Sequence, residues 1–377
     1  MTRLPPPEEV IRAIDGFLDG PPVESLGLDL KPFLIVERYL TALGRTPAAR
    51  GPLHRIRAQL RSAALRVLPA AALGPPVVEL RRVRPGPGPR HLFVFGMPWS
   101  DQGYAGFNIG VIRALADPAR AVVVTSDRPC FDRWCREGVD AVLLTARARR
   151  LDPAHRFPGA RTGEPEKLTR AAALLRSADA LLGELAPVSV STTQDYHVYD
   201  QAFARAARRR GIPTLTHQHG LIPDRAVTLY KYVFSDRIAV WGRRSARLMA
   251  RWVPEDRIWV TGTDRFDGLR SDRPPADRPI LALGVNPIGE ARDLAILGAV
   301  SEALRRVSAG PVVALRPVLK LHPSLDIARW EGHAARVGHG VPWEIRQAGN
   351  EVMLPLTRFM LAQRSTITLD AAVAGAT

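Results

Sequence analysis

The sequence contains little cysteine. Its 377 residues include only Cys130 and Cys135, which are too few for a disulfide framework. Their spacing fits no common zinc pattern, so we predict that both are packing or surface residues. Chains without structural disulfides are typical of reducing compartments, and this favours a cytoplasmic location.

Lysine is also scarce, because only four of the 53 basic side chains are lysines. The formal net charge is nevertheless +16, and such a charge can indicate nucleic-acid binding. The arginines are instead spread over the whole chain among many alanines and prolines, and the sequence contains no RNP, zinc-finger or arginine-glycine pattern. We therefore expect no nucleic-acid partner. Attraction to anionic lipids or to phosphorylated substrates is an alternative use of the charge.

Long apolar runs are missing as well. No stretch reaches the roughly 18 apolar residues that a membrane-spanning helix needs, and the initial sequence MTRLPPPEEV lacks the apolar core of a signal peptide. We expect a cytoplasmic protein, with peripheral contact at the inner face of the plasma membrane as the alternative. The hydrophobic content of 46% and the chain length suffice for two ordinary domains.

Residues 1–88 are expected to form a helical extension and a linker. Apolar residues recur at helical spacing in residues 8–18, 32–43 and 54–68. The third segment is rich in arginine, and a basic amphipathic helix can lie on a membrane surface. A solvated face on a helix packed against the main body is the simpler interpretation. The sequence PGPGP at residues 85–89 is typical of a linker.

Two α/β domains are expected after the extension, at residues 89–250 and 251–377. Buried apolar runs alternate with segments of helical spacing, and this order implies parallel sheets. The predicted strands are residues 91–95, 121–125, 141–145, 188–191, 213–216, 280–284, 312–315, 319–321 and 359–362. The principal predicted helices are residues 168–185, 199–210, 291–307 and 327–337.

The stretch from residue 213 to residue 267 is the centre of the functional interpretation. A short apolar run ends there in His217, Gln218, His219 and Gly220. Polar groups at the carboxyl ends of buried strands lie where open α/β sheets bind ligands. We expect residues 217–220 to face a cleft between the two domains. The alternative is that backbone groups next to Gly220 simply satisfy both histidines.

Five motifs in this order resemble the two-Rossmann-domain sugar transferases of the GT-B fold, above all bacterial enzymes of surface and capsular polysaccharide synthesis. The resemblance covers roughly residues 91 to 375. The motifs are HQHG at 217–220, SDRIAVWG at 235–242, RIWVTGTDRFD at 257–267, LKLHPS at 319–324 and RSTITLDAAVAG at 364–375.

The resemblance implies a metal-independent Leloir-type glycosyltransferase, or a related glycerophosphotransferase. Its donor would be a CMP-, CDP- or UDP-linked sugar and its acceptor a glycan or a lipid-linked molecule. The donor itself is a substrate, and no further cofactor is expected. No DxD-like motif occurs in the cleft segments, and no carboxylate or cysteine is spaced to complete a metal site with His217 and His219.

Glycosyl transfer requires cations or imidazole near the leaving phosphate and a general base for the acceptor hydroxyl. The base is assigned to His219, with Asp195 and Asp101 as rivals, since all three follow predicted strands. The proposed phosphate group comprises Arg316, Lys320, His322, Ser365 and Thr366. For His322 the alternative is a strand-end histidine before a turn-forming proline.

Two departures from the resembled family leave other functions open. The sugar-nucleotide 2-epimerases share the domain order, but they usually carry an acidic residue within their counterpart of HQHG, which is absent here. The family also continues past the Ser/Thr-rich helix with a strand and a helix that crosses back to the first domain. We therefore expect an incomplete C-terminal domain, and a non-catalytic binding or scaffold protein is a third alternative.

Overall fold

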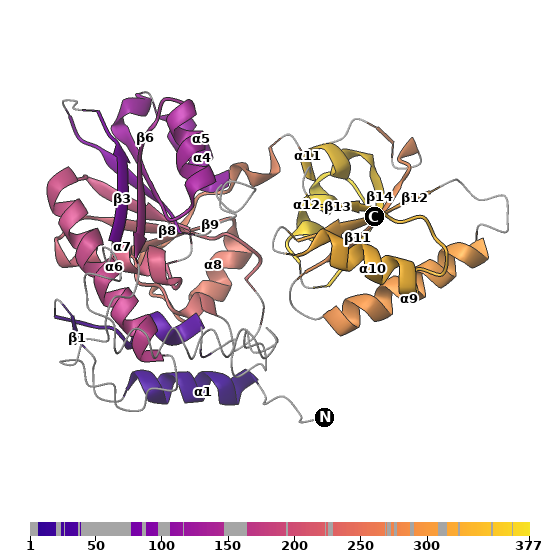
Figure 1. Ribbon diagram of the computed structural model, residues 1–377, viewed down its shortest axis with the longest axis horizontal. Helices are drawn as coiled ribbons and strands as arrows, with labels where there is room; N and C mark the ends of the chain where they lie inside the picture. The colour runs from indigo at the N-terminus through magenta and orange to yellow at the C-terminus, as the bar shows by residue number, and fades with distance from the viewer. Residues whose placement is uncertain are drawn as a thin grey trace. The chain divides into compact units, whose positions relative to one another are not determined.

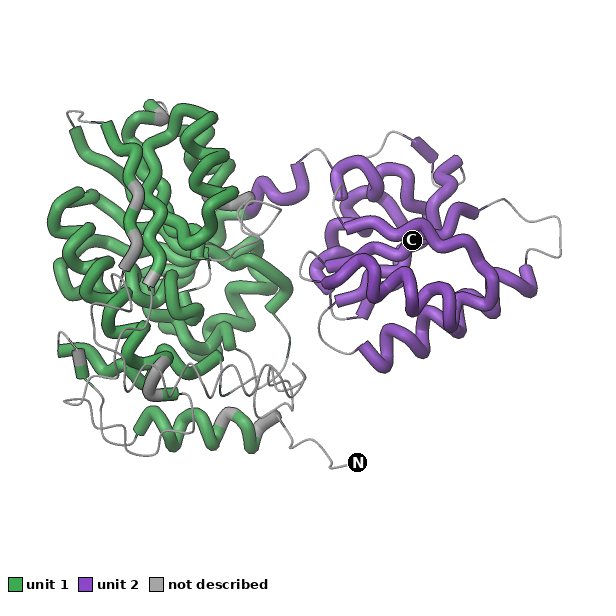
Figure 2. The backbone as a smooth tube through the Cα atoms, in the orientation of Figure 1, with its two compact units in different colours: residues 1–262 green, residues 263–377 purple. Residues whose placement is uncertain are grey.

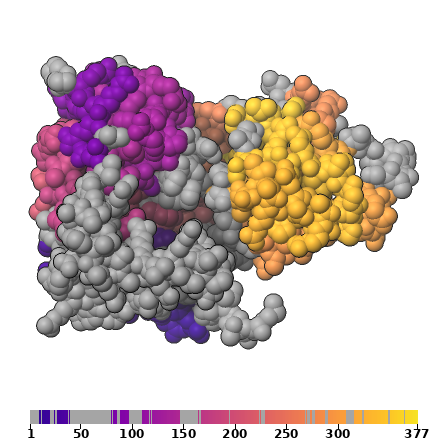
Figure 3. Space-filling model, in the orientation of Figure 1, coloured from indigo at the N-terminus to yellow at the C-terminus, as the bar shows by residue number. Residues whose placement is uncertain are grey.

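The structure, a computed structural model, divides into two compact units, Met1–Gly262 and Thr263–Thr377 (Figure 2). The described residues are 7–19, 24–25, 27–36, 38, 77–84, 88–96, 106–115, 117–146, 164–193, 195–222, 224, 229–267, 269, 273–274, 277–286, 290–307, 315–322, 325–347, 350–363 and 365–377. Figure 3 shows them in colour on one face of the molecule.

An eight-stranded sheet forms the centre of the first unit, in the order β10-β9-β8-β7-β4-β5-β6-β3 (Figure 1). Every neighbouring pair is parallel except β3–β6, so β3 closes one edge in the antiparallel sense. The strands are β3 (Val77–Arg82), β4 (His91–Phe95), β5 (Ala121–Thr125), β6 (Asp140–Ala146), β7 (Ser189–Thr192), β8 (Thr214–His217), β9 (Arg237–Val240) and β10 (Ile258–Val260).

Helices pack on both faces of this sheet, because side chains along a strand alternate between the two faces. Leu92 and Val94 of β4 pack with residues of α6 (Glu164–Leu185) and α7 (Val198–Arg209). Phe93 and Phe95 of the same strand pack with residues of α4 (Gly106–Ala114) and α5 (Arg128–Arg136). A further helix, α8 (Arg243–Met249), packs against β9. Cys130 and Cys135 of α5 are buried, as the packing interpretation predicts.

The N-terminal segment contains α1 (Pro7–Leu18), a short hairpin of β1 (Glu24–Ser25) and β2 (Leu28–Asp29), and the 3₁₀ helix η1 (Lys31–Leu34). Helix α1 confirms the predicted helix at residues 8–18. The predicted helix at residues 54–68 lies outside the described residues. Strand β3 differs from the expectation of a helical extension and linker over residues 1–88, because it pairs with β6 and so belongs to the main sheet.

The second unit holds a four-stranded parallel sheet in the order β13-β12-β11-β14. Its helices pack on the sheet through two apolar clusters, with Leu297 and Trp330 in one cluster and Leu354 and Ala371 in the other. Its elements are β11 (Ile280–Val285), α9 (Glu290–Val307), β12 (Arg316–Leu321), α10 (Ile327–Val337), β13 (Glu344–Arg346), α11 (Asn350–Met353), β14 (Thr357–Ala362) and α12 (Ile367–Val373).

The units divide after Gly262, whereas the sequence pattern predicts a domain boundary between residues 250 and 251. Strand β10 pairs with β9 in the first sheet, and this pairing keeps residues 251–262 in the first unit. Short 3₁₀ helices connect the larger elements: η5 (Pro118–Arg120), η6 (Leu229–Lys231), η7 (Glu255–Arg257), η8 (Asp264–Phe266) and η10 (Leu354–Leu356). Among the described helices, none combines the length and apolarity needed to cross a bilayer.

Candidate functional site

The HQHG segment lies at the carboxyl end of β8, and Gln218 fixes its path. The Gln218 side chain is buried, donates to the Gly220 carbonyl at 2.8 Å and accepts from the Trp241 amide at 3.0 Å. The Gln218 backbone amide donates to the Ala239 carbonyl at 2.9 Å. Gln218 therefore ties the chain after β8 to the end of β9, and His217 and His219 flank this tie.

His219 lies between two tyrosines. Its Nε2 is 3.3 Å from the Tyr196 hydroxyl and 3.2 Å from the Tyr230 hydroxyl. The His219 ring stacks on Tyr230, while Tyr196 meets it edge-on. A half-buried imidazole with phenol hydroxyls on its nitrogen is a suitable general acid or base, because its orientation is fixed. Tyr196 follows β7 and Tyr230 belongs to η6, and neither was predicted as a site residue.

His217 makes a separate contact. Its Nε2 is 3.0 Å from the Ser191 hydroxyl on the neighbouring strand β7. Burial lowers the His217 pKa to about 4, so the imidazole is neutral at pH 7. A neutral, hydrogen-bonded histidine on the sheet face is satisfied within the fold, but its partner is the Ser191 side chain and not the backbone next to Gly220.

The Asp195 carboxylate binds backbone amides. Its Oδ2 accepts from the amides of Phe234 at 2.9 Å and Ser235 at 2.6 Å, and the residue is 2% exposed. Burial raises the Asp195 pKa to about 6, although the hydrogen bonds from the two backbone amides and the positive charge of Arg257 oppose that shift. The carboxyl group therefore anchors the segment before β9. Asp101, the other rival for the base, lies outside the described residues.

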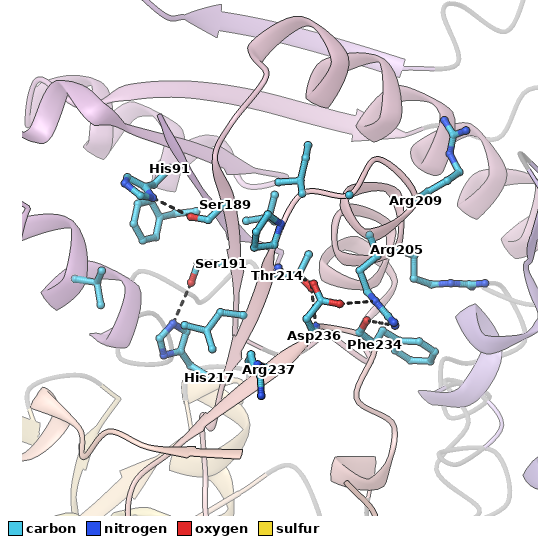
Figure 4. Close-up of a pocket in the computed structure, with 18 of the residues that line it drawn as sticks. His91, Ser189, Ser191, Arg205, Arg209, Thr214, His217, Phe234, Asp236 and Arg237 are labelled. Carbon is cyan, nitrogen blue, oxygen red and sulfur yellow. Dashed lines mark hydrogen bonds and ion pairs between the residues drawn. The ribbon is translucent and has the colours of Figure 1, made fainter. Parts of the chain in front are cut away.

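A groove of about 1090 Å³ crosses the sheet face next to His217 (Figure 4). His91 Nδ1 lies 2.8 Å from the Ser189 hydroxyl, in parallel with the Ser191–His217 pair. Asp236 accepts from the amide and the hydroxyl of Thr214 at 2.9 and 2.8 Å. These polar groups are engaged with one another, and His219 does not line this groove.

Four of the predicted phosphate-binding residues lie at the carboxyl ends of parallel strands in the second sheet. Lys320 and His322 lie at the end of β12, and Ser365 and Thr366 follow β14. Lys320 is 5% exposed, and its Nζ donates to the carbonyls of Gln347 and Leu321. Burial lowers the Lys320 pKa to about 8. Burial and the Lys320 charge both lower the pKa of His322. Parallel strands end at the same edge, so the four residues lie on one side of the sheet, with β11 between β12 and β14.

The turn after β14 is held by its own polar groups. The Ser365 carbonyl accepts from the Thr368 hydroxyl at 2.8 Å, and the Ser365 hydroxyl accepts from the Ile367 amide at 3.4 Å. Thr366 is the N-cap residue of α12. Asn286, at the end of β11, donates from Nδ2 to the Gln363 carbonyl at 2.9 Å and so links the neighbouring strand ends. Asn286 was not predicted as a site residue.

Arg316 is the one predicted phosphate-binding residue that the structure separates from the other four. It is the first residue of β12, whereas Lys320 lies near the last. Four residues of extended strand span about 13 Å. The Arg316 Nε lies 3.4 Å from a Glu344 carboxylate oxygen at the amino edge of the sheet. Within the part of the chain that the structure describes, no group of three or more His, Cys, Asp or Glu side chains could hold a metal ion.

No protein-family model matches this chain, and neither does any curated protein. Solved structures do match. A Listeria monocytogenes protein assigned as a UDP-N-acetylglucosamine 2-epimerase has a TM-score of 0.52 at 14% identity, covering 77% of this chain and 78% of its own. The MnaA–UDP structure of S. aureus has a TM-score of 0.50 at 13% identity, with the same coverage of 77% and 78%. The glycotransferase of kitacinnamycin has a TM-score of 0.45 at 14% identity, covering 76% and 78%.

The first two similarities concern the fold, because their sequence identities are low. They confirm the predicted fold class, an α/β chain with two Rossmann-like domains of the GT-B type.

Proposed function

We propose that the chain is an enzyme acting on a nucleotide-activated sugar. The observation that carries this proposal is the set of groups at the carboxyl edge of the second sheet. The Lys320 amine donates there to two backbone carbonyls and lies within electrostatic reach of His322 and of the Glu351 carboxylate. The Ser365–Thr366 turn follows β14, which is separated from β12 by β11 in the same sheet. With a pKa of about 8, Lys320 is mostly protonated at pH 7, and its charge favours a phosphate at this edge.

Glycosyl transfer is the leading reaction. Lys320 and His322 would stabilise the charge that develops on the leaving nucleotide, and His219 would take the proton of the acceptor hydroxyl. Tyr196 and Tyr230 would keep the imidazole oriented during that transfer. The motif resemblance supports a role in surface polysaccharide synthesis, on a glycan or lipid-linked acceptor at the cytoplasmic side of the membrane.

A sugar-nucleotide 2-epimerase is the second candidate. The specific observation in its favour is the fold similarity to the Listeria monocytogenes protein and to MnaA bound to UDP. The two reactions share a nucleotide-sugar substrate, so the carboxyl edge of the second sheet suits both. They differ in that an epimerase needs no acceptor.

The first test is a thermal-shift screen with CMP, CDP, UDP, GDP and their sugar conjugates, on the wild type, His322→Ala and Arg316→Ala. A ligand at about 100 times its Kd adds roughly 2.7 kcal/mol to the free energy of unfolding. We expect a shift for one nucleotide that is lost in His322→Ala and kept in Arg316→Ala, because Arg316 lies at the opposite end of β12. If no nucleotide gives a shift, the enzyme proposal is wrong and a non-catalytic scaffold protein is the better interpretation.

The second test separates the two reactions. The nucleotide sugar identified by the screen is incubated with the protein alone, and the products are resolved by chromatography. Appearance of the 2-epimer without an acceptor would identify an epimerase. Release of nucleotide that depends on an added glycan or lipid-linked acceptor would identify a transferase.

A further inference from the structure

Helix α1 is tied to the segment that carries Tyr230. Both carboxylate oxygens of Asp15 lie 2.8 Å from Lys231 Nζ, and Asp15 Oδ1 accepts from the Tyr232 hydroxyl at 3.1 Å. Lys231 lies 216 residues further along the chain, so the contact joins the N-terminal segment to η6. Val10 and Ile14 of the same helix belong to an apolar cluster that continues to that segment, packing with Leu229, Tyr232 and Phe234.

The same segment is held at its other end by Asp195, which accepts from the Phe234 and Ser235 amides. Two carboxylates, one from α1 and one from the end of β7, therefore anchor the chain between residues 231 and 235. Tyr230 stands directly before the first anchored residue. Its hydroxyl and ring both contact His219.

We propose that α1 is a working part of the candidate site, with Asp15 as a positioning residue that keeps Tyr230 against His219. Asp15 itself touches neither His219 nor any reacting group, and it acts through Lys231 and Tyr232. A partly exposed ion pair alone contributes little to stability. Here the pair and the second hydrogen bond fix two consecutive side chains, which restricts the backbone on which Tyr230 stands. The consequence for activity rests on the proposed role of His219, whereas the contact chain does not.

The experiment measures the rate at which diethyl pyrocarbonate modifies His219, by peptide mapping, without substrate. The proteins are the wild type, Asp15→Ala, Asp15→Asn and the matched control Glu9→Ala, which removes an exposed carboxylate from the same helix. We expect the His219 rate to rise about fivefold in Asp15→Ala and less in Asp15→Asn, because losing this contact shifts a local opening equilibrium by that order. Exposed His339 is the internal reference, and Glu9→Ala is expected to match the wild type.

A charge swap keeps the test decisive if Asp15→Ala unfolds. Asp15→Lys and Lys231→Asp are each expected to expose His219, and the double variant is expected to return its rate to within about twofold of the wild type. Unfolding of the whole unit would instead raise the modification rate of His217, which is paired with Ser191, in parallel. An unchanged His219 rate in Asp15→Ala, or a double variant no better than the singles, would overturn the proposal. Because no substrate is present, an inactive protein would refute the proposed function and leave this result readable.

Discussion

Tyr230 stacks on His219 with ring centroids 5.1 Å apart and ring planes 19° apart. The stack leaves the Tyr230 hydroxyl 3.3 Å from Nδ1 and 3.2 Å from Nε2, so one residue sets the plane of the imidazole and also makes a polar contact with both of its nitrogens. Removing the hydroxyl and removing the ring are therefore separable perturbations.

Tyr230→Phe is expected to lower kcat by about 3- to 10-fold with little effect on stability, because it removes the polar contact of the hydroxyl with the imidazole nitrogens, worth about 1 kcal/mol, and keeps the stack. Tyr230→Ala is expected to lower the free energy of unfolding by about 3 kcal/mol, since the ring is buried. Steady-state kinetics and urea melts measure the two effects. A Tyr230→Phe variant with unchanged kcat would contradict a role of the hydroxyl.

The proposed role of Lys320 predicts that nucleotide binding depends on pH. Its pKa of about 8 in the free protein would rise when a phosphate binds nearby, so binding would take up a proton. The affinity for UDP is therefore expected to fall above pH 8, by at most about tenfold per pH unit. Calorimetric titrations at pH 7, 8 and 9 measure this slope. The Lys320→Met variant should bind UDP more weakly, and its affinity should not fall in this way above pH 8. A variant whose affinity falls as steeply as that of the wild type would exclude Lys320 as the source of the pH dependence.

Asp195 gives stability a pH dependence of its own. Its pKa is raised to about 6 in the folded protein, so the folded state holds a proton that the unfolded state releases near pH 4. This stabilisation is present at low pH and is lost as the pH rises through 6. Between pH 4.5 and pH 7 it amounts to about 2 kcal/mol.

The Asp195→Asn variant is expected to lose that share of the pH dependence, because its amide does not titrate. Urea melts of both proteins at pH 4.5 and pH 7 isolate the Asp195 contribution from those of other carboxyl groups. Equal pH dependence in the two proteins would show that Asp195 titrates normally.

Gly96 is expected to tolerate no side chain. A Cβ atom there would lie 2.0 Å from Asp200 Oδ2 and 2.9 Å from the Tyr199 Cβ. Gly96→Ala should lower the free energy of unfolding by about 1–3 kcal/mol through overpacking. Gly332→Ala is the matched control, because a Cβ atom at this position in α10 would meet no neighbouring atom within 4 Å. The control should instead add up to about 1 kcal/mol. Equal stability of the two variants would contradict the close approach.

Buried parallel strands could be predicted from the sequence because their apolar runs are continuous. Residues 91–95 and 121–125 coincide with β4 and β5. Strand β3 could not be predicted in this way. Its sequence VVELRR ends in charged residues, since it lies at the antiparallel edge of the sheet and its side chains there are exposed. The strand predicted at 319–321 falls within β12, which begins at residue 316, whereas most of the segment predicted at 312–315 lies outside the described residues.

The site could be predicted only where it follows from strand ends. Lys320 and His322 lie at the predicted edge because they end an apolar run. Arg316 precedes the same run. The sequence pattern does not show that β12 begins at Arg316, and this start places the residue at the far end of the strand from Lys320. Tyr230 reaches His219 through an irregular segment without periodicity, and no sequence pattern announces such a contact.

The order of strands in the first sheet also has a consequence during synthesis on the ribosome. Strands β4, β5 and β6 are neighbours in sequence and in space, so they can pair as soon as they emerge. The other edge of β4 can pair only after β7 has been synthesised, because Ser189 of β7 lies 98 residues beyond His91 of β4. Until then one edge of the central strand is open to pairing with another chain. Chains that end before residue 189 should therefore aggregate more readily after release from the ribosome than chains that end after residue 217. Sedimentation of the two sets of released chains measures this difference.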